Sequence, residues 1–187
     1  MALTCRASIK ELSNWNVHQE KEEGMKNLFA LFFTVALLLM SACTQKVDLE
    51  AEKAKVKTVV DQFAQVWETE DMELFSKIMA HDADMVNYGT DAAEYFVGWE
   101  ALKEAVEKMF PSFENIKITV KDQVIKVHPS GNVAWFSEAW DWDLVVEGQP
   151  VRSEGGRFTG VLEKRNGNWV FVQFHNSVPV SGQAAQY

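Results

Sequence analysis

The sequence predicts an α+β domain in which helices come first and a curved antiparallel sheet follows. Two observations support this. Apolar residues recur every three to four positions up to residue 110, whereas from residue 116 onward they alternate with polar ones. In addition, the pair at residues 166–167 is Asn-Gly, a strong signal for a β-hairpin, and it separates two alternating runs. We expect a single domain over residues 55–180.

Three helices are predicted before the sheet. The first carries an apolar stripe of six residues: Val56, Val59, Val60, Phe63, Val66 and Trp67. A short second helix is expected over residues 72–79 and a third over residues 99–110, which Pro111 ends. Between these two helices we expect a strand over residues 83–88 and a loop over residues 89–98.

Four long strands are expected to form the sheet. The first contains Ile116, and a change in the phase of its alternation at residues 122–124 predicts a β-bulge. The next two strands are expected over residues 133–146 and 151–164, with a turn between them. The Asn-Gly pair at residues 166–167 then leads into the last strand.

The last strand determines where the expected pocket lies. Unbroken alternation places five residues on one face: Trp169, Phe171, Gln173, His175 and Ser177. This face begins with two aromatic residues and ends with three hydrogen-bonding side chains. Such an arrangement is typical of a pocket wall above an apolar floor.

Five short motifs combine glycine, aromatic and polar residues at fixed spacings: Arg157-x-Thr159-x-Val161-Leu162, Gly167-x-Trp169, Gln173-x-His175-x-Ser177, Ala134-Trp-Phe-Ser-Glu138 and Gly89-Thr-Asp-x-x-Glu94-x-x-x-Gly98. Together they resemble SnoaL-like proteins of the nuclear transport factor 2-like superfamily. The resemblance covers residues 53–179. It implies a cone-shaped, half-open barrel with a pocket in its mouth. Because this superfamily includes isomerases, cyclases, dehydratases and non-catalytic binders, the resemblance implies a fold rather than one activity.

Eight residues are candidates for binding a ligand in this cone: His175, Gln173, Ser177, Arg157, Glu138, Trp135, Tyr88 and Trp67. We expect Arg157 to pair with Glu138, because a cation on a core-facing stripe is costly without a partner. Alternatively, Arg157 binds a carboxylate of the ligand. We expect His175 beside Trp135 or Trp67, as a ligand contact, a general acid or base, or a core histidine.

Two further features bear on the chemistry of the pocket. Ketosteroid isomerases use an Asp base and an oxyanion hole of a Tyr and a protonated Asp. Here Tyr88 is the only tyrosine near a suitable strand, and Trp67 or Phe63 occupies the part of the first helix where that family places its Tyr, which argues against isomerase chemistry. Trp140 and Trp142 share a strand face, either as a platform for a ligand or as a face covered by a helix or a partner.

Composition and spacing argue against two classes of function. The chain carries a formal net charge of −9 at pH 7, which disfavours binding to nucleic acid. His81, Asp82 and Asp84 are close in sequence but lack the spacing typical of metal ligands. We therefore assign no metal and no cofactor.

The N-terminal region resembles a bacterial lipoprotein signal. Residues 28–39 form an apolar run that is too short to span a bilayer as a helix but suits a secretory signal. Small residues before Cys43 resemble a lipobox, in which the cysteine is lipidated. Residues 21–24 are Lys-Glu-Glu-Gly, which a purine-rich ribosome-binding sequence encodes when translated in frame. We therefore interpret residues 1–24 as upstream sequence and Met25 as the initiator.

These observations predict a signal peptide over residues 25–42, a lipid on Cys43, a tether over residues 43–54 and a tail over residues 181–187. The alternative is an ordinary signal peptide or an N-terminal anchor helix. We expect a protein of the bacterial cell envelope that faces the periplasm or the exterior. Its expected partners are a small molecule, the membrane through its lipid, and a second copy in a homodimer.

The predicted function is the binding of a small, partly apolar molecule in the cone of this lipid-anchored domain. Two alternatives stay open. One is an isomerase or dehydratase of the ketosteroid isomerase type. The other is a non-catalytic oligomerisation module that pairs through its convex sheet face.

Overall fold

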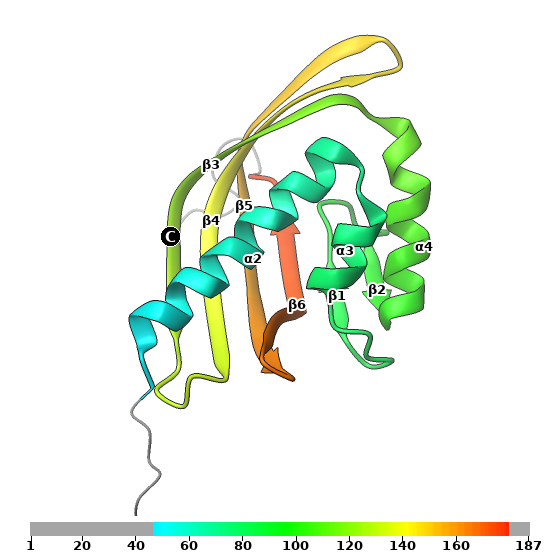
Figure 1. The fold of residues 1–187 in the computed structure, drawn as a ribbon. Helices are drawn as coiled ribbons and strands as arrows, with labels where there is room; N and C mark the ends of the chain where they lie inside the picture. Colours follow the sequence, from blue (N-terminus) through cyan, green and yellow to red (C-terminus); the bar gives the residue numbers. More distant parts are fainter. Residues whose placement is uncertain (1–46, 180–187) are drawn as a thin grey trace, which may run out of the picture. The chain divides into compact units, whose positions relative to one another are not determined.

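The computed structural model describes residues 47–179. Within this range three α-helices lie on one face of a curved six-stranded sheet, in the strand order β2-β1-β6-β5-β4-β3 (Figure 1). The predicted α+β fold with a cone-shaped, half-open barrel is therefore confirmed. The predictions for residues 1–24, for the signal peptide, for Cys43 and for the tail lie outside the described residues. None of the helices in residues 47–179 has the length and apolar character needed to cross a membrane.

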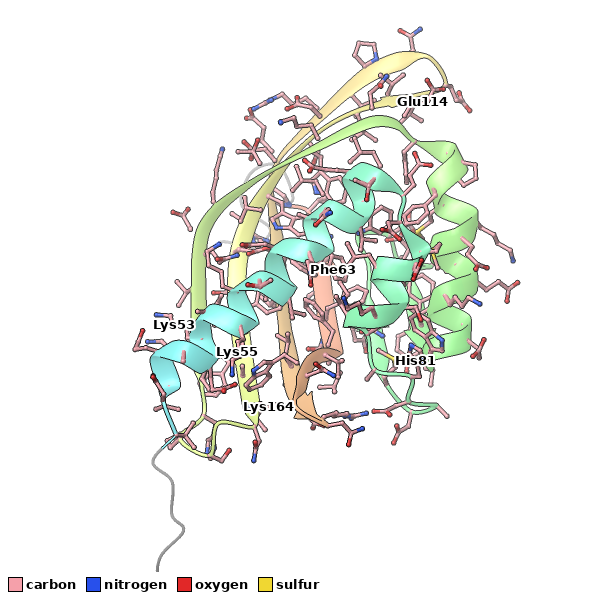
Figure 2. The ribbon with its side chains drawn as sticks, in the orientation of Figure 1. Lys53, Lys55, Phe63, His81, Glu114 and Lys164 are labelled. Atoms are coloured by element: carbon pink, nitrogen blue, oxygen red, sulfur yellow. The ribbon has the colours of Figure 1, made fainter. Side chains whose placement is uncertain are left out.

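Helix α2 (Leu49–Thr69) runs across the concave face of the sheet (Figure 1). It begins within the segment predicted as a tether, because the Asp48 carboxylate accepts a hydrogen bond from the N–H of Ala51 and caps the helix. The tether prediction is therefore wrong for residues 49–54. The predicted apolar stripe is largely buried, with Phe63 at its centre between the helix and the sheet (Figure 2).

Two shorter helices follow α2. Helix α3 (Met72–Ile78) begins at Asp71, whose carboxylate accepts a hydrogen bond from the N–H of Leu74. Helix α4 (Trp99–Met109) continues into a single 3-10 turn, η1 (Phe110–Ser112). Both helices lie where the apolar periodicity predicts them.

The segment between these helices contains two short strands rather than one. Strand β1 (Val86–Tyr88) is shorter than predicted, and β2 (Tyr95–Val97) lies within the predicted loop. A strand of three residues is too short to produce a recognisable alternation, which explains why it was missed. β1 pairs antiparallel with β2 and parallel with the last strand, through Tyr88 and His175.

The four long strands are antiparallel to one another: β3 (Glu114–Val127), β4 (Val133–Val146), β5 (Gln149–Arg165) and β6 (Asn168–Ser177). The register between β3 and β4 shifts between Lys121 and Val124, so the predicted bulge is confirmed. A second shift lies between β5 and β6, where Val161 pairs with Gln173 but Leu162 pairs with Phe171.

This second shift leaves Val172 as an extra residue in β6 and reverses the phase of the strand after it. Beyond the bulge, Phe174 and Asn176 are buried, whereas His175 is exposed. The predicted unbroken alternation is therefore wrong. The residues of β6 that face inward at the mouth of the cone are therefore Phe174 and Asn176, and not Gln173, His175 and Ser177 as predicted.

The narrow end of the cone, beside the N-terminal end of α2, is closed by a buried carboxylate. Glu52 accepts hydrogen bonds of 2.8 Å from the Nζ atoms of Lys164 and Lys55 and from Nε1 of Trp169. Lys55 and Lys164 both lie at this end (Figure 2). The hydrogen bonds, chiefly that from Lys164, lower the pKa of Glu52 to about 2.

Candidate functional site

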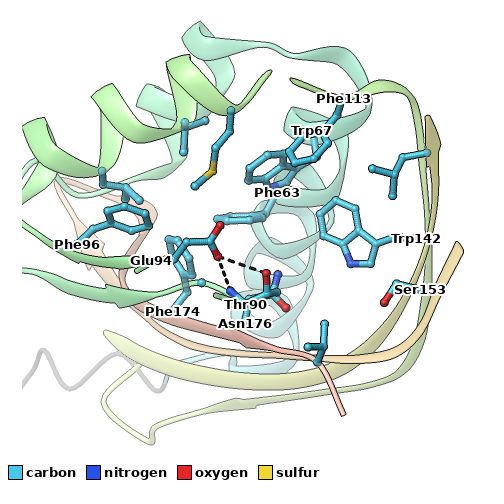
Figure 3. Close-up of a pocket in the computed structure, with 16 residues that line it drawn as sticks. Phe63, Trp67, Thr90, Glu94, Phe96, Phe113, Trp142, Ser153, Phe174 and Asn176 are labelled. Carbon is cyan, nitrogen blue, oxygen red and sulfur yellow. Dashed lines mark hydrogen bonds between the residues drawn. The ribbon is translucent and has the colours of Figure 1, made fainter. Parts of the chain in front are cut away.

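A cavity of about 240 Å³ lies at the wide end of the cone, between α2, α4, the β1–β2 turn and the concave side of β4, β5 and β6 (Figure 3). Six aromatic side chains contribute to its wall: Phe63, Trp67, Phe96, Phe113, Trp142 and Phe174. Cavities of about 150 Å³ with apolar walls bind benzene. This cavity therefore has room for a ligand somewhat larger than a single ring.

Glu94 is the only charged side chain among the described residues that line this cavity. Its Oε2 accepts hydrogen bonds from the N–H of Thr90 at 2.5 Å, from the N–H of Asp91 at 3.0 Å and from Oγ1 of Thr90 at 3.3 Å. No hydrogen bond to its Oε1 is formed within residues 47–179. The turn therefore holds one oxygen of the carboxylate and leaves the other open.

Gly89 makes this arrangement possible. Its N–H donates to the main-chain oxygen of Glu94 at 2.8 Å, and the Glu94 side chain folds over it. A Cβ at position 89 would collide with the Glu94 carboxylate. The absence of a side chain at Gly89 thus allows Glu94 to lie at the wall of the cavity.

Polar atoms near the cavity lack partners within the described residues. Asn176 is buried and its Oδ1 accepts no hydrogen bond, and the buried Nε1 of Trp67 donates none. In neighbouring β1, Asn87 accepts from the N–H of Phe174 at 3.0 Å, but its Nδ2 has no partner either. Because buried polar groups are nearly always paired, such atoms mark places where bound water or a ligand completes the hydrogen bonding.

Only one of the eight predicted ligand-binding residues, Trp67, lies in the wall of this cavity. Glu138 is buried outside this wall, and its carboxylate accepts hydrogen bonds from Nε2 of Gln123 and Nε1 of Trp140. Burial raises the pKa of Glu138.

The predicted ion pair between Arg157 and Glu138 is wrong. Arg157 lies opposite Ala139 and is exposed on the outer face of the sheet, whereas Glu138 lies opposite Phe158 and faces inward. Arg157 does share a face with Thr159, as the alternation predicts. That face is the convex one, where a cation needs no internal partner.

The predicted position of His175 inside the cavity is also wrong. His175 lies on the convex face, and its ring centre is 5.8 Å from that of Tyr88. Gln173 and Ser177 lie on the same face as His175, because alternate residues of a strand share a face. Tyr88 and Trp135 are 47% and 46% exposed there. The predicted homodimer would use this convex face, and it stays a prediction.

The cavity residues outside the eight predicted ligand-binding residues come from two places. Glu94 and Gly89 belong to the SnoaL-like motif over residues 89–98, whose turn brings Glu94 to the cavity wall. Phe174 and Asn176 reach the cavity only through the bulge at Val172, for which the sequence contains no signal. Within the described residues, no cluster of three metal-ligating side chains occurs, and His81 instead stacks on the ring of Trp99.

Structural comparison places this architecture among nuclear transport factor 2-like folds. A superfamily protein from Salmonella enterica is 20% identical, with a TM-score of 0.65, over 74% of this chain and 99% of the other. A proposed dehydratase of the same superfamily from Streptomyces avermitilis is 16% identical, with a TM-score of 0.63, over 71% and 99% of the two chains. These likenesses show the fold.

A protein of unknown function from Pseudomonas putida, also nuclear transport factor 2-like, is 17% identical, with a TM-score of 0.58, over 71% of this chain and 89% of the other. No curated protein matches the chain in sequence. The family model for the SnoaL-like domain matches residues 56–181, which is most of the chain. The chain therefore belongs to the SnoaL-like domain family.

Proposed function

We propose that this domain binds a small, partly apolar molecule in the cavity at the wide end of its cone. The observation that supports this most directly is the contrast within the cavity wall. Six aromatic side chains surround a space that also contains the open Oε1 of Glu94. An apolar pocket with few polar groups is the usual form of a small-molecule site.

Filling the cavity tests this proposal. Met109→Trp places a larger side chain in the cavity wall, and Lys108→Trp, on the exposed side of the same helix, is the matched control. Native mass spectrometry of the mature chain should show a co-purified small molecule with wild type and with Lys108→Trp, and lose it with Met109→Trp. Equal retention by both variants would place the ligand elsewhere.

A reaction is the second candidate, and the open oxygen of Glu94 is the observation that favours it. A carboxylate in an apolar cavity can abstract a proton from carbon, as an isomerase or dehydratase requires. However, no second titratable side chain lines the cavity within residues 47–179, so Glu94 would have to act both as the base and, once protonated, as the acid. Binding needs no second catalytic group and is the function that this geometry supports best.

We further propose that a lipid on Cys43 anchors the domain in the bacterial cell envelope. The short apolar run and the lipobox-like residues before Cys43 support this proposal. Cys43→Ser should release the protein from membranes and abolish labelling with a fatty-acid analogue, while the SnoaL-like domain folds as before. Unlabelled wild type, or unchanged membrane association of the variant, would contradict the anchor.

A further inference from the structure

We infer that the cavity selects an organic cation, in which an ammonium group on an apolar body binds at Glu94. This inference rests on the proposed function and names the chemical class of its ligand. It follows from three properties of the cavity: its charge, the orientation of its carboxylate and the character of its wall.

Among residues 47–179, no positive side chain compensates the negative charge of the cavity. Glu94 is partly buried, forms no ion pair within residues 47–179, and shares the cavity wall with no Lys, Arg or His. Because removing a carboxylate from water without a counter-charge is costly, a ligand that displaces water from Glu94 binds best if it brings a positive charge.

The Glu94 carboxylate is also oriented to receive a donor. Three hydrogen bonds within the turn all end on its Oε2, and they fix the side chain with Oε1 free. Figure 3 shows the carboxylate reaching from the turn toward the space between Phe96 and Trp142. An ammonium N–H placed in that space can donate to Oε1 without breaking any hydrogen bond of the turn.

The wall of the cavity favours the same ligand. Aromatic faces attract cations, tryptophan most strongly, and Trp67 and Trp142 both line the cavity, with ring centres 5.8 Å apart. The net charge of −9 also raises the local concentration of cations around the protein. A carboxylate ligand would meet Glu94 as a like charge, and a neutral ligand would leave the charge of Glu94 without a counter-charge.

Two probes of nearly equal size separate charge from hydrogen bonding. Benzylammonium and benzyl alcohol carry the same ring and both donate a hydrogen bond, but only the first is a cation. Isothermal titration of the mature chain should give a dissociation constant about tenfold lower for benzylammonium. This preference should weaken as salt is raised, and benzoate should bind most weakly.

Substitutions test whether Glu94 causes the preference for benzylammonium over benzyl alcohol. Glu94→Gln should abolish this preference and keep the binding of benzyl alcohol. Gly89→Ala should reduce it by displacing the carboxylate, and Glu100→Gln, an exposed carboxyl outside the cavity wall, should leave it unchanged. Titration of each variant with benzyl alcohol reports whether that variant keeps an intact cavity.

The outcomes distinguish this inference from the proposed function. Equal or tighter binding of benzyl alcohol, tighter binding of benzoate, or a preference that survives Glu94→Gln would overturn the cation class and leave a neutral or anionic ligand for the same cavity. Binding of neither benzylammonium nor benzyl alcohol at millimolar concentration would overturn both the inference and the proposed cavity.

Discussion

Buried polar groups at the two ends of helix α2 differ in whether they have hydrogen-bond partners. At the narrow end, the buried Glu52 is surrounded by donors from Lys55, Lys164 and Trp169. At the wide end, the indole of Trp67 has no partner among the described residues, and Glu94 has one open oxygen. The narrow end therefore completes its hydrogen bonds within the chain, whereas the wide end leaves several buried polar atoms without a partner among the described residues.

Strand β6 connects these two ends, and its bulge separates them. Before Val172, the inward residues Trp169 and Phe171 pack into the closed end. After it, Phe174 and Asn176 face the cavity. The extra residue Val172 thus determines which side chains of β6 face inward at the wide end.

Exchange of the inward and outward residues after Val172 should have the largest effect on this comparison. Phe174→His combined with His175→Phe places a polar ring at an inward position and an apolar ring at an outward one, without a change of register. We expect a loss of more than about 3 kcal/mol in the free energy of unfolding, because a polar group becomes buried and apolar area becomes exposed. Urea unfolding measures this loss, with His175→Phe alone, on the exposed face, as the control. A double variant as stable as the control would show that stability does not depend on an apolar residue at position 174.

Matched substitutions of two tryptophans should have the next largest effect. Trp169→Phe removes a donor to Glu52 and should lower the free energy of unfolding by about 1–3 kcal/mol. Trp67→Phe removes an N–H that has no partner within residues 47–179. We therefore expect a smaller loss, due to the lost ring area alone, together with weaker binding of benzylammonium. Urea unfolding and titration of both variants test this pair. Equal losses of stability would mean that the Trp67 indole is paired in solution.

Two buried carboxyl groups should change the free energy of unfolding with pH in opposite directions. We expect these changes to be smaller than the effects above. Glu52 has a lowered pKa, about 2, so its stabilisation is complete above its ordinary value near 4.5 and is lost as the pH falls toward 2. Burial raises the pKa of Glu138, so its contribution is most favourable below about 4.5 and is lost as the pH rises through the raised folded value.

Relative to wild type, Glu138→Gln should therefore gain stability as the pH rises from 4 toward 8. Glu52→Gln should lose stability as the pH rises from 2 toward 5. Urea unfolding across pH 2–8 gives both differences. Slopes of the same sign for the two variants would contradict the assigned directions of the pKa shifts.

Local patterns in the sequence were sufficient to predict most elements of the fold. The stripe on α2, the bulge near Asp122 and the Asn-Gly hairpin were each visible within a few neighbouring residues. The bounds of β4 at residues 133–146 agree with the prediction, because both flanking turns contain glycine. Periodicity records which face of an element is buried, and it depends only on the backbone geometry of that element.

The candidate site depended on the tertiary structure. The register of β6 is set by its pairing with β5, so the bulge at Val172, and with it the inward position of Asn176, follows from contacts distant in sequence. Glu94 reaches the cavity because the turn from Gly89 closes onto its carboxylate. Alternation specifies two faces of a strand but not which one turns toward the core, and a single extra residue exchanges them. Local sequence patterns were therefore enough to predict the fold and the family resemblance, whereas the pairing of β5 with β6 set which residues of β6 line the cavity.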